Sequence, residues 1–267
     1  MNTTGCHISR GKKQGTVAFI GAGPGAADLI TVRGLNRIKH AACIIYAGSL
    51  VNKEIFDGCR APLHDSASMH LEEITSLMIE TCRQGGNVAR VHTGDPALFG
   101  AIKEQIMRLD KAGVDYEIIP GVTSAFGAAA ALGAELTLPE VTQTVIFTRR
   151  GGRTPVPEEE ALSKLAVHGA TMIIFLSVAM IDDVVSELVE GAYTRETPAT
   201  VVMRATWPNE KIVRGTLGDI AAKVKIEGIR KTALICVGDV FGDAGFKTDS
   251  KLYNRAFTHG HRNGKDE

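Results

Sequence analysis

The chain lacks an excess of charge of either sign, because 30 acidic residues balance its 30 basic ones. A protein without net charge has no general field that attracts nucleic acid or a membrane surface, so we expect neither as a partner. A ligand that carries many negative charges would have to meet local clusters of basic side chains. The 267 residues are enough for one large domain or two smaller ones.

Long apolar runs and paired cysteines are also missing. The longest apolar run, around residues 172–181, is far shorter than the roughly 20 residues that a membrane span needs. Residues 1–15 are polar and basic, without the apolar core of a signal peptide. The five cysteines include no C-x-x-C pair, and Cys43 and Cys236 lie in apolar strand patterns typical of core residues. We therefore expect a soluble protein of the reduced cytoplasm.

A metal site is not expected. The eight histidines form no ligand cluster with cysteines or carboxylates in the sequence. His259 and His261 stand close together in a polar C-terminal tail, where a solvated role is favoured over metal binding.

The most informative stretch that is present is GTVAFIGAGPGAADLITVRG, residues 15–34. Its apolar start predicts a strand, its glycines predict a turn, and a helix is expected from about Asp28. Because glycine has no Cβ, a ligand can lie against the bare backbone of such a turn. Open α/β folds bind ligands at the carboxyl edge of the sheet, so the pattern predicts a binding site there.

A dinucleotide-binding fold is the first alternative, and two features disfavour it. The G-x-G-x-x-G/A pattern is met only loosely, with Ala26 in the last position. The acidic residue that holds the ribose should follow the next strand, but that strand runs through Tyr46 into Ala47 and Gly48 without a carboxylate. An NAD(P)-dependent oxidoreductase is therefore a remote alternative. A tight turn without a ligand is another.

Strand and helix patterns alternate along the chain, which predicts an α/β fold with a mostly parallel sheet. The segments 199–204 and 211–214 are close enough to form a strand pair. Pro120-Gly121 is the expected boundary between two α/β domains, 16–120 and 121–243, with tails at 1–15 and 244–267. The predicted strands are 16–20, 42–46, 87–92, 115–119, 142–148, 172–176, 199–204, 211–214 and 232–237, and the predicted helices are 29–41, 70–84, 99–112, 122–132, 158–167, 181–189 and 216–225.

Four turns rich in small residues each follow a predicted strand: Gly21–Gly25, Thr93–Pro96, Pro120–Ser124 and Ala205–Pro208. In a parallel sheet such turns lie at the carboxyl edge. We expect them to build one cleft of backbone and small side chains.

With these turns in view, the sequence resembles the tetrapyrrole methyltransferases that use S-adenosylmethionine. The segments GAGPGAADLITVRG, TGDPALFG, PGVTSAFGAAA and ATWPNEKIVRGTL carry the resemblance, in order, over about residues 16–242. YAGSLVN, TRRGGRTPVP and SKLYNRAF are similar to the branch that methylates C11 of precorrin-4, or of its cobalt form, in cobalamin biosynthesis. Methylation of another corrin-ring carbon is the alternative within the family.

The resemblance implies a tetrapyrrole methylase fold, with two α/β domains and a ligand cleft between them, in a homodimer. The methyl donor, S-adenosyl-L-methionine, would bind there and leave as S-adenosyl-L-homocysteine. By motif, the residues implied to contact the donor are Pro24, Gly94, Asp95, Leu98, Thr123, Ser124, Phe175, Leu176, Arg204, Ala205, Thr206 and Ala233.

The implied tetrapyrrole carries many carboxylates, so its binding surface needs hydrogen-bond donors. Arg149, Arg150 and Arg153 form the best local cluster, because the planar guanidinium suits carboxylates. A solvated loop is the alternative for this segment. Further expected substrate contacts are Gly23, Tyr46, Ser49, Asn52, Ser66 and Ser68.

Two positions depart from other members of the family. Ala26 stands where many members have aspartate, and Ala47 stands where the uroporphyrinogen methyltransferases have the aspartate of a Y-D-x-L-V motif. The second change argues against uroporphyrinogen as the substrate. No catalytic base is identified, although Tyr46, His64 and Asp65 are candidates by position. A non-catalytic tetrapyrrole carrier is disfavoured, because it would need no turns around a second ligand.

Overall fold

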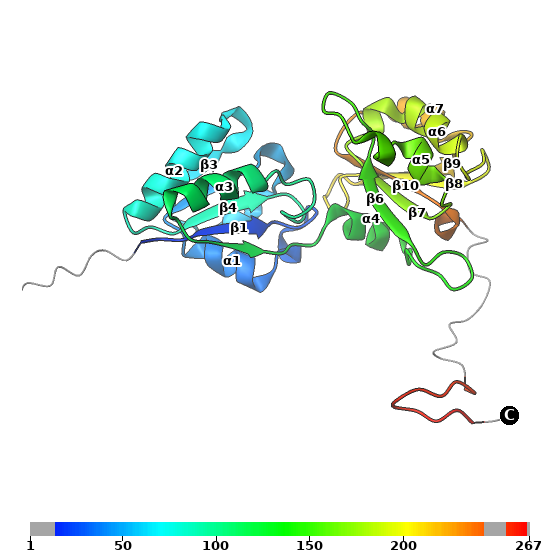
Figure 1. Ribbon diagram of the computed structural model, residues 1–267, viewed down its shortest axis with the longest axis horizontal. Coiled ribbons are helices and arrows are strands. Elements are labelled where there is room, and N and C mark those ends of the chain that lie inside the picture. Colours follow the sequence, from blue (N-terminus) through cyan, green and yellow to red (C-terminus); the bar gives the residue numbers. More distant parts are fainter. Residues whose placement is uncertain (1–13, 243–254, 266–267) are drawn as a thin grey trace, which may run out of the picture. The chain divides into compact units, whose positions relative to one another are not determined.

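The computed structural model describes residues 14–242 and 255–265, and it divides into two compact units, Met1–Ser124 and Ala125–Glu267 (Figure 1). The division falls a few residues after the expected boundary at Pro120-Gly121. Gly121 stays with the first unit because its backbone N–H donates a hydrogen bond to Asp95. Most of the two expected tails lies outside the described residues.

The first unit contains a five-stranded sheet in which every pairing is parallel, in the order β3-β2-β4-β1-β5. One face packs on α1, and the other packs on α2 and α3. The alternating pattern therefore predicted the parallel pairing of this half, but the short edge strand at Leu63–Asp65 was not among the predicted strands. Its elements are β1 (Val17–Gly21), α1 (Val32–Lys39), β2 (Cys43–Tyr46), β3 (Leu63–Asp65), α2 (Leu71–Arg83), β4 (Val88–His92), α3 (Lys103–Ala112) and β5 (Tyr116–Ile119).

Two helices of this unit begin later than predicted. Helix α1 starts at Val32, because the side chain of Thr31 caps it by accepting a hydrogen bond from the N–H of Gly34. Helix α3 starts at Lys103 rather than Phe99. Phe99 and Ala101 have φ angles of 57° and 49°, and these left-handed conformations are incompatible with a right-handed helix.

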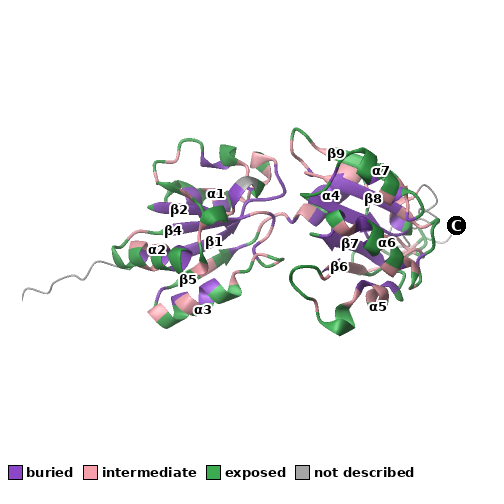
Figure 2. Ribbon diagram, turned by 90° about the horizontal axis from the view of Figure 1, so that it is seen from above, coloured by how far each residue is buried: buried purple, intermediate pink, exposed green. Residues whose placement is uncertain are grey.

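The second unit also has a five-stranded sheet, in the order β6-β7-β10-β8-β9. Helices α5, α6 and α7 cover one face, and α4 contacts the other through Phe126 and Phe147, whose ring centroids are 6.0 Å apart. Figure 2 shows strands of both sheets coloured as buried. The elements are α4 (Ser124–Leu132), β6 (Val145–Arg149), α5 (Leu162–Ala166), β7 (Thr171–Phe175), α6 (Ile181–Val189), β8 (Pro198–Met203), β9 (Lys211–Thr216), α7 (Ile220–Ile226) and β10 (Ala233–Val237).

The prediction of a mostly parallel sheet is wrong for this unit. Only β6 and β7 pair in parallel, whereas β10 pairs antiparallel with β7 and β8, and β8 pairs antiparallel with β9. The short connection between β8 and β9 allows only a hairpin, because a parallel crossover needs a dozen or more residues. Strands β6, β7 and β8 nevertheless run in one direction, so their carboxyl ends and the start of β10 share one edge of the sheet.

Candidate functional site

Three of the four predicted turns meet at the carboxyl edge of the first sheet, because β4, β1 and β5 are neighbours. The N–H of Gly94 donates to the carbonyl of Gly23 at 2.8 Å. A Cβ on Gly21 would lie 2.5 Å from the Cα of Gly121, so the two loops touch through their backbones. The loops that meet here contain the expected first-unit donor contacts, which are Pro24, Gly94, Asp95, Leu98, Thr123 and Ser124, as well as Gly23.

Asp95 ties two of these loops together. Its Oδ1 accepts from the N–H of Ala97 at 2.8 Å, and its Oδ2 accepts from the N–H of Gly121 at 2.9 Å. The carboxylate therefore caps a turn at Ala97 rather than the start of α3. It joins the loop after β4 to the loop after β5, and its direct contact with the methyl donor stays a prediction.

Two of the polar residues expected to contact the tetrapyrrole in the first unit, Ser66 and Asn52, have local partners. Ser66 Oγ donates to the carbonyl of Tyr46 at 3.0 Å, and Asn52 Oδ1 accepts from the N–H of Glu54 at 3.1 Å. The Tyr46 side chain is 5% exposed, and its ring centroid lies 5.4 Å from that of Phe56. These contacts shape the segment after β2.

The three candidate bases lie on adjacent strands. Tyr46 pairs with Asp65 in the register of β2 and β3, and His64 is next to it on β3. Asp65 Oδ1 accepts from the N–H of Ala67 at 2.9 Å, which gives this carboxylate a role in a local turn. Nothing in this geometry singles out one of the three as the base.

In the second unit, the residues expected to contact the donor gather at the edge where β7 and β8 end and β10 begins. Arg204 N donates to the carbonyl of Thr232 at 2.9 Å and so joins two of these segments. The residues expected here are Phe175, Leu176, Arg204, Ala205, Thr206 and Ala233.

The backbone at this second edge is strained. Leu176, Arg204, Thr206 and Thr232 have φ angles of 55°, 51°, 68° and 57°. Each such conformation costs roughly 1–3 kcal/mol, and conformations of this kind cluster at functional sites. The backbone thus marks the same edge as the sequence motifs do. Thr232 was not predicted, because no residue type there signals a positive φ.

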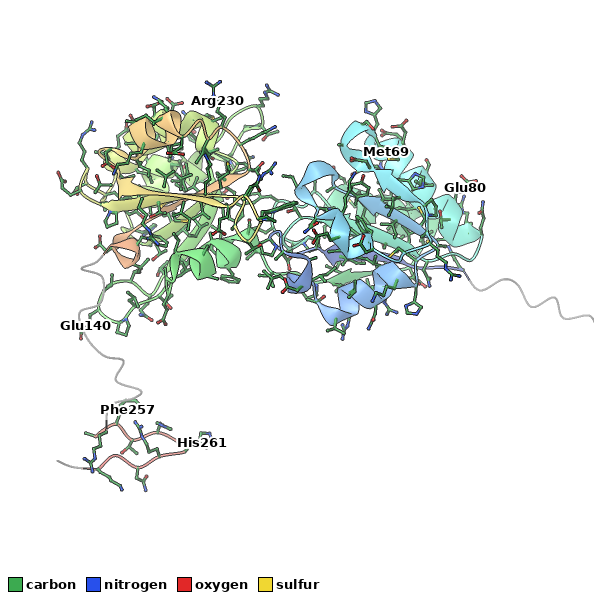
Figure 3. All side chains as sticks on the ribbon, turned by 180° about the vertical axis from the view of Figure 1, so that it is seen from behind. Met69, Glu80, Glu140, Arg230, Phe257 and His261 are labelled. Atoms are coloured by element: carbon green, nitrogen blue, oxygen red, sulfur yellow. The ribbon has the colours of Figure 1, made fainter. Side chains whose placement is uncertain are left out.

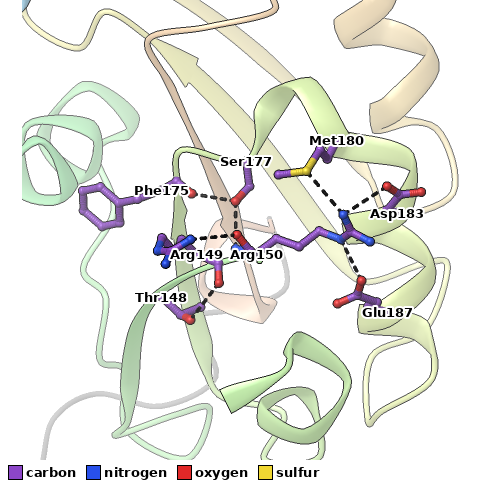
Figure 4. Close-up of polar contacts among 8 residues, drawn as sticks. All are labelled: Thr148, Arg149, Arg150, Phe175, Ser177, Met180, Asp183 and Glu187. Carbon is purple, nitrogen blue, oxygen red and sulfur yellow. Dashed lines mark hydrogen bonds and ion pairs between the residues drawn. The ribbon is translucent and has the colours of Figure 1, made fainter. Parts of the chain in front are cut away.

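The loop after β6 uses two of its three arginines internally (Figure 4). Arg150 Nε lies 2.7 Å from Glu187 Oε1, and its Nη1 lies 3.2 Å from Asp183 Oδ2. Arg149 donates through its guanidinium to the carbonyls at positions 154 and 155, at 3.0 and 2.8 Å. Arg153 is exposed. Of the three arginines, Arg153 is therefore the one best placed to meet a ligand.

Strand β4 also carries two buried basic side chains near the carboxyl edge of the first sheet. Arg90 and His92 are 5% and 4% exposed. Arg90 donates to Gln105 Oε1 at 3.0 Å and to the carbonyl of Ile45 at 3.4 Å. Burial lowers the pKa of Arg90 to about 10, and burial together with the Arg90 charge lowers the pKa of His92 to about 3. Sequence reasoning missed both, because residues 87–92 have the pattern of an ordinary strand.

The depressed pKa of His92 predicts a loss of stability in acid. Between its ordinary value of 6.5 and its folded value of about 3, the unfolded chain binds a proton that the folded chain does not. The free energy of unfolding should therefore fall as the pH falls through this window. His92→Phe preserves a ring beside Phe19, 6.1 Å away. In this variant the free energy of unfolding, measured by urea denaturation, should change less between pH 7 and pH 5 than it does in the wild type. An equal dependence of the unfolding free energy on pH in the variant and the wild type would contradict this account of His92.

No helix within 14–242 or 255–265 has the length and apolarity to span a membrane. Over these ranges, no group of three or more histidines, cysteines and carboxylates is placed to hold a metal ion. His259 and His261 lie on the segment 255–265, with ring centroids 6.3 Å apart. Figure 3 labels His261 on this segment.

The fold defines an α/β protein in which turns of small residues and left-handed backbone lie at the ends of strands, where ligand sites are expected. The sequence matches the family model of the tetrapyrrole (corrin/porphyrin) methylases over residues 16–221. The chain belongs to this family.

Two curated relatives cover nearly the whole chain. A cobalt-precorrin-4 C(11)-methyltransferase of Methanocaldococcus jannaschii is 56% identical, over 92% of this chain and 95% of the relative. A precorrin-4 C(11)-methyltransferase of Pseudomonas aeruginosa is 49% identical, over 94% of this chain and 100% of the relative.

Solved structures agree with this assignment. The structure of a cobalt-precorrin-4 methyltransferase of cobalamin biosynthesis has a TM-score of 0.84 and 47% identity, over 88% of this chain and 99% of that one. A uroporphyrin-III C-methyltransferase of Thermus thermophilus, complexed with S-adenosylhomocysteine, has a TM-score of 0.70 and 26% identity, over 85% and 93% of the two chains.

Proposed function

We propose that this protein transfers a methyl group from S-adenosyl-L-methionine to C11 of precorrin-4, or of its cobalt form, in cobalamin biosynthesis. The observation that carries the proposal is the identity of 56% over almost the full length of a relative with this activity in its name. Relatives named for the metal-free and for the cobalt substrate are both similar to this chain. We further propose that the enzyme is a cytoplasmic homodimer.

The residues at the first edge fit a methyl donor. Gly94 leaves bare backbone there, because a Cβ on it would still lie 3.6 Å from Ser124 N, its nearest non-neighbouring atom. The donor would supply a sulfonium methyl group, which an electron-rich ring carbon displaces. The task of the protein is then alignment, which can lower the barrier by roughly 7–11 kcal/mol. We propose the contacts expected from the motifs, in both units, as its donor-binding residues.

Ala47 supports a corrin precursor over uroporphyrinogen as the substrate. Its backbone N–H donates to the carbonyl of Val91 at 3.0 Å, which holds the residue at the end of β2. A methyl side chain at this position cannot accept the proton that an aspartate could accept.

The arginine loop gives a prediction on substrate binding. Arg153→Ala should weaken tetrapyrrole binding about fivefold to tenfold, because an exposed charge-assisted contact is lost, and should leave the melting temperature unchanged. Arg150→Ala is the matched comparison. It should lower the melting temperature instead, because it breaks the ion pairs with Glu187 and Asp183. Absorbance titration and thermal melts separate the two effects, and equal affinity in wild type and Arg153→Ala would exclude this arginine as a contact.

A substrate panel tests the proposed function. Labelled S-adenosylmethionine should pass its methyl group to precorrin-4 or cobalt-precorrin-4 and not to uroporphyrinogen III. The ratio of kcat/KM for the first two substrates identifies the preferred metal state. Efficient methylation of uroporphyrinogen III would contradict the proposal.

A further inference from the structure

Phe99 lies in the loop between β4 and α3 and is held in an unfavourable state. Its side chain is 45% exposed, and its backbone is in the left-handed region with a φ of 57°. Bulky residues rarely adopt this conformation, and it persists only where the surrounding structure fixes it. The chain thus keeps a large apolar ring at the surface on a strained backbone.

The structure fixes this loop at both ends. Asp95 anchors its start through the N–H groups of Ala97 and Gly121. At its end, Gln105 Nε2 donates to the carbonyl of Ala101 at 3.0 Å, and Gln105 Oε1 accepts from the buried Arg90. Phe99 is therefore presented by a preorganised loop.

The position of Phe99 relates it to the candidate site. Its loop begins at Gly94 and Asp95, at the carboxyl edge where the three glycine-rich turns meet. Among the exposed large apolar side chains described in the first unit, only Leu50 and Phe99 lie in connections that leave the carboxyl ends of strands, and of these two only Phe99 is aromatic. The full set is Val32, Leu50, Leu63, Phe99, Met107, Tyr116 and Ile118.

We propose that Phe99 is a substrate-contacting residue whose ring packs against the apolar face of the tetrapyrrole. This inference rests on the proposed function. A tetrapyrrole carries its carboxylates at the rim and offers a flat conjugated face, on which a phenyl ring packs well. The turns nearby consist of backbone and small side chains, which suit the polar donor instead. Because the loop is already ordered, this contact costs little conformational entropy on binding.

The test compares Phe99→Ala and Phe99→Leu with Met107→Ala as the control. Met107 is 60% exposed on α3. Alanine and leucine carry a Cβ as phenylalanine does, so neither substitution at position 99 relieves the strain of the positive φ. Phe99→Ala should raise the KM for the tetrapyrrole about tenfold or more, with S-adenosylhomocysteine affinity unchanged within about twofold. Phe99→Leu should recover part of the loss, and Met107→Ala should match the wild type.

An unchanged KM in Phe99→Ala would overturn the inference. So would a loss of S-adenosylhomocysteine affinity in place of a tetrapyrrole effect, because Phe99 would then contact the donor. If the wild type transfers no methyl group to either form of precorrin-4, the proposed function fails. Absorbance titration of wild type and Phe99→Ala with the tetrapyrrole then still tests the contact itself.

Discussion

Replacing Gly94 with valine is expected to lower the affinity for S-adenosylmethionine more than about a hundredfold while the protein stays folded. Gly94 has a φ of 60°, and a Cβ there would lie 3.6 Å from Ser124 N and 3.7 Å from Thr123 Cα. The protein therefore has room for the side chain, but the added atoms occupy space beside the loops expected to hold the donor. Isothermal calorimetry with S-adenosylhomocysteine measures the loss.

Gly113→Val is the matched control for this variant. Gly113 has a φ of 66°, and no atom lies within 4 Å of its added Cβ. Both variants carry the strain of a β-branched residue in a left-handed conformation, about 1–3 kcal/mol. Donor affinity should be lost only in Gly94→Val. Wild-type donor affinity in Gly94→Val, or an equal loss of affinity in Gly113→Val, would contradict a donor site at this edge of the first sheet.

Gly121→Ala is expected to damage the fold rather than binding alone. Its Cβ would overlap the carbonyl oxygen of Gly94 and lie 2.7 Å from the Cα of Gly21, so two backbone segments would have to separate. Forced overpacking of this kind lowers the free energy of unfolding by about 1–3 kcal/mol, and the loss is larger where the clash is with backbone that cannot move. Urea denaturation measures the change.

Gly151→Ala gives the comparison for this second prediction. Its nearest contact would be the flexible Val156 side chain, at 3.3 Å, so the change in unfolding free energy should stay within about 0.5 kcal/mol. If Gly121→Ala were as stable as Gly151→Ala, the close approach of the three loops would be contradicted.

The first unit could be predicted from sequence because its determinants are local. Apolar strands alternate with amphipathic helices, and glycines mark the turns after β1 and β4, so parallel topology brings the loops to one edge. The antiparallel course of β10 could not be predicted, because its place between β7 and β8 depends on packing across the whole sheet. The late start of α3 depends on left-handed conformations at Phe99 and Ala101, which their residue types do not signal.

The grouping of the candidate residues at strand edges was predictable to a similar degree. The family motifs point to residues that the structure groups at two strand edges, but they do not reveal what each side chain bonds. The charge cluster at 149–153 looks uniform in sequence, whereas Arg150 pairs with Glu187 and Asp183 on α6. Asp95 was expected to contact the donor, and both its oxygens bond backbone N–H groups of the loops. Such partners come from distant segments, so sequence spacing cannot supply them.

The central claim is methyl transfer to one ring carbon, and carbon-13 NMR of the product tests it most directly. The enzyme is incubated with S-adenosylmethionine labelled in its methyl group and with precorrin-4, in parallel with cobalt-precorrin-4. A single labelled methyl group at C11 is the predicted result. Label at another ring carbon, or no transfer to either substrate, would contradict it.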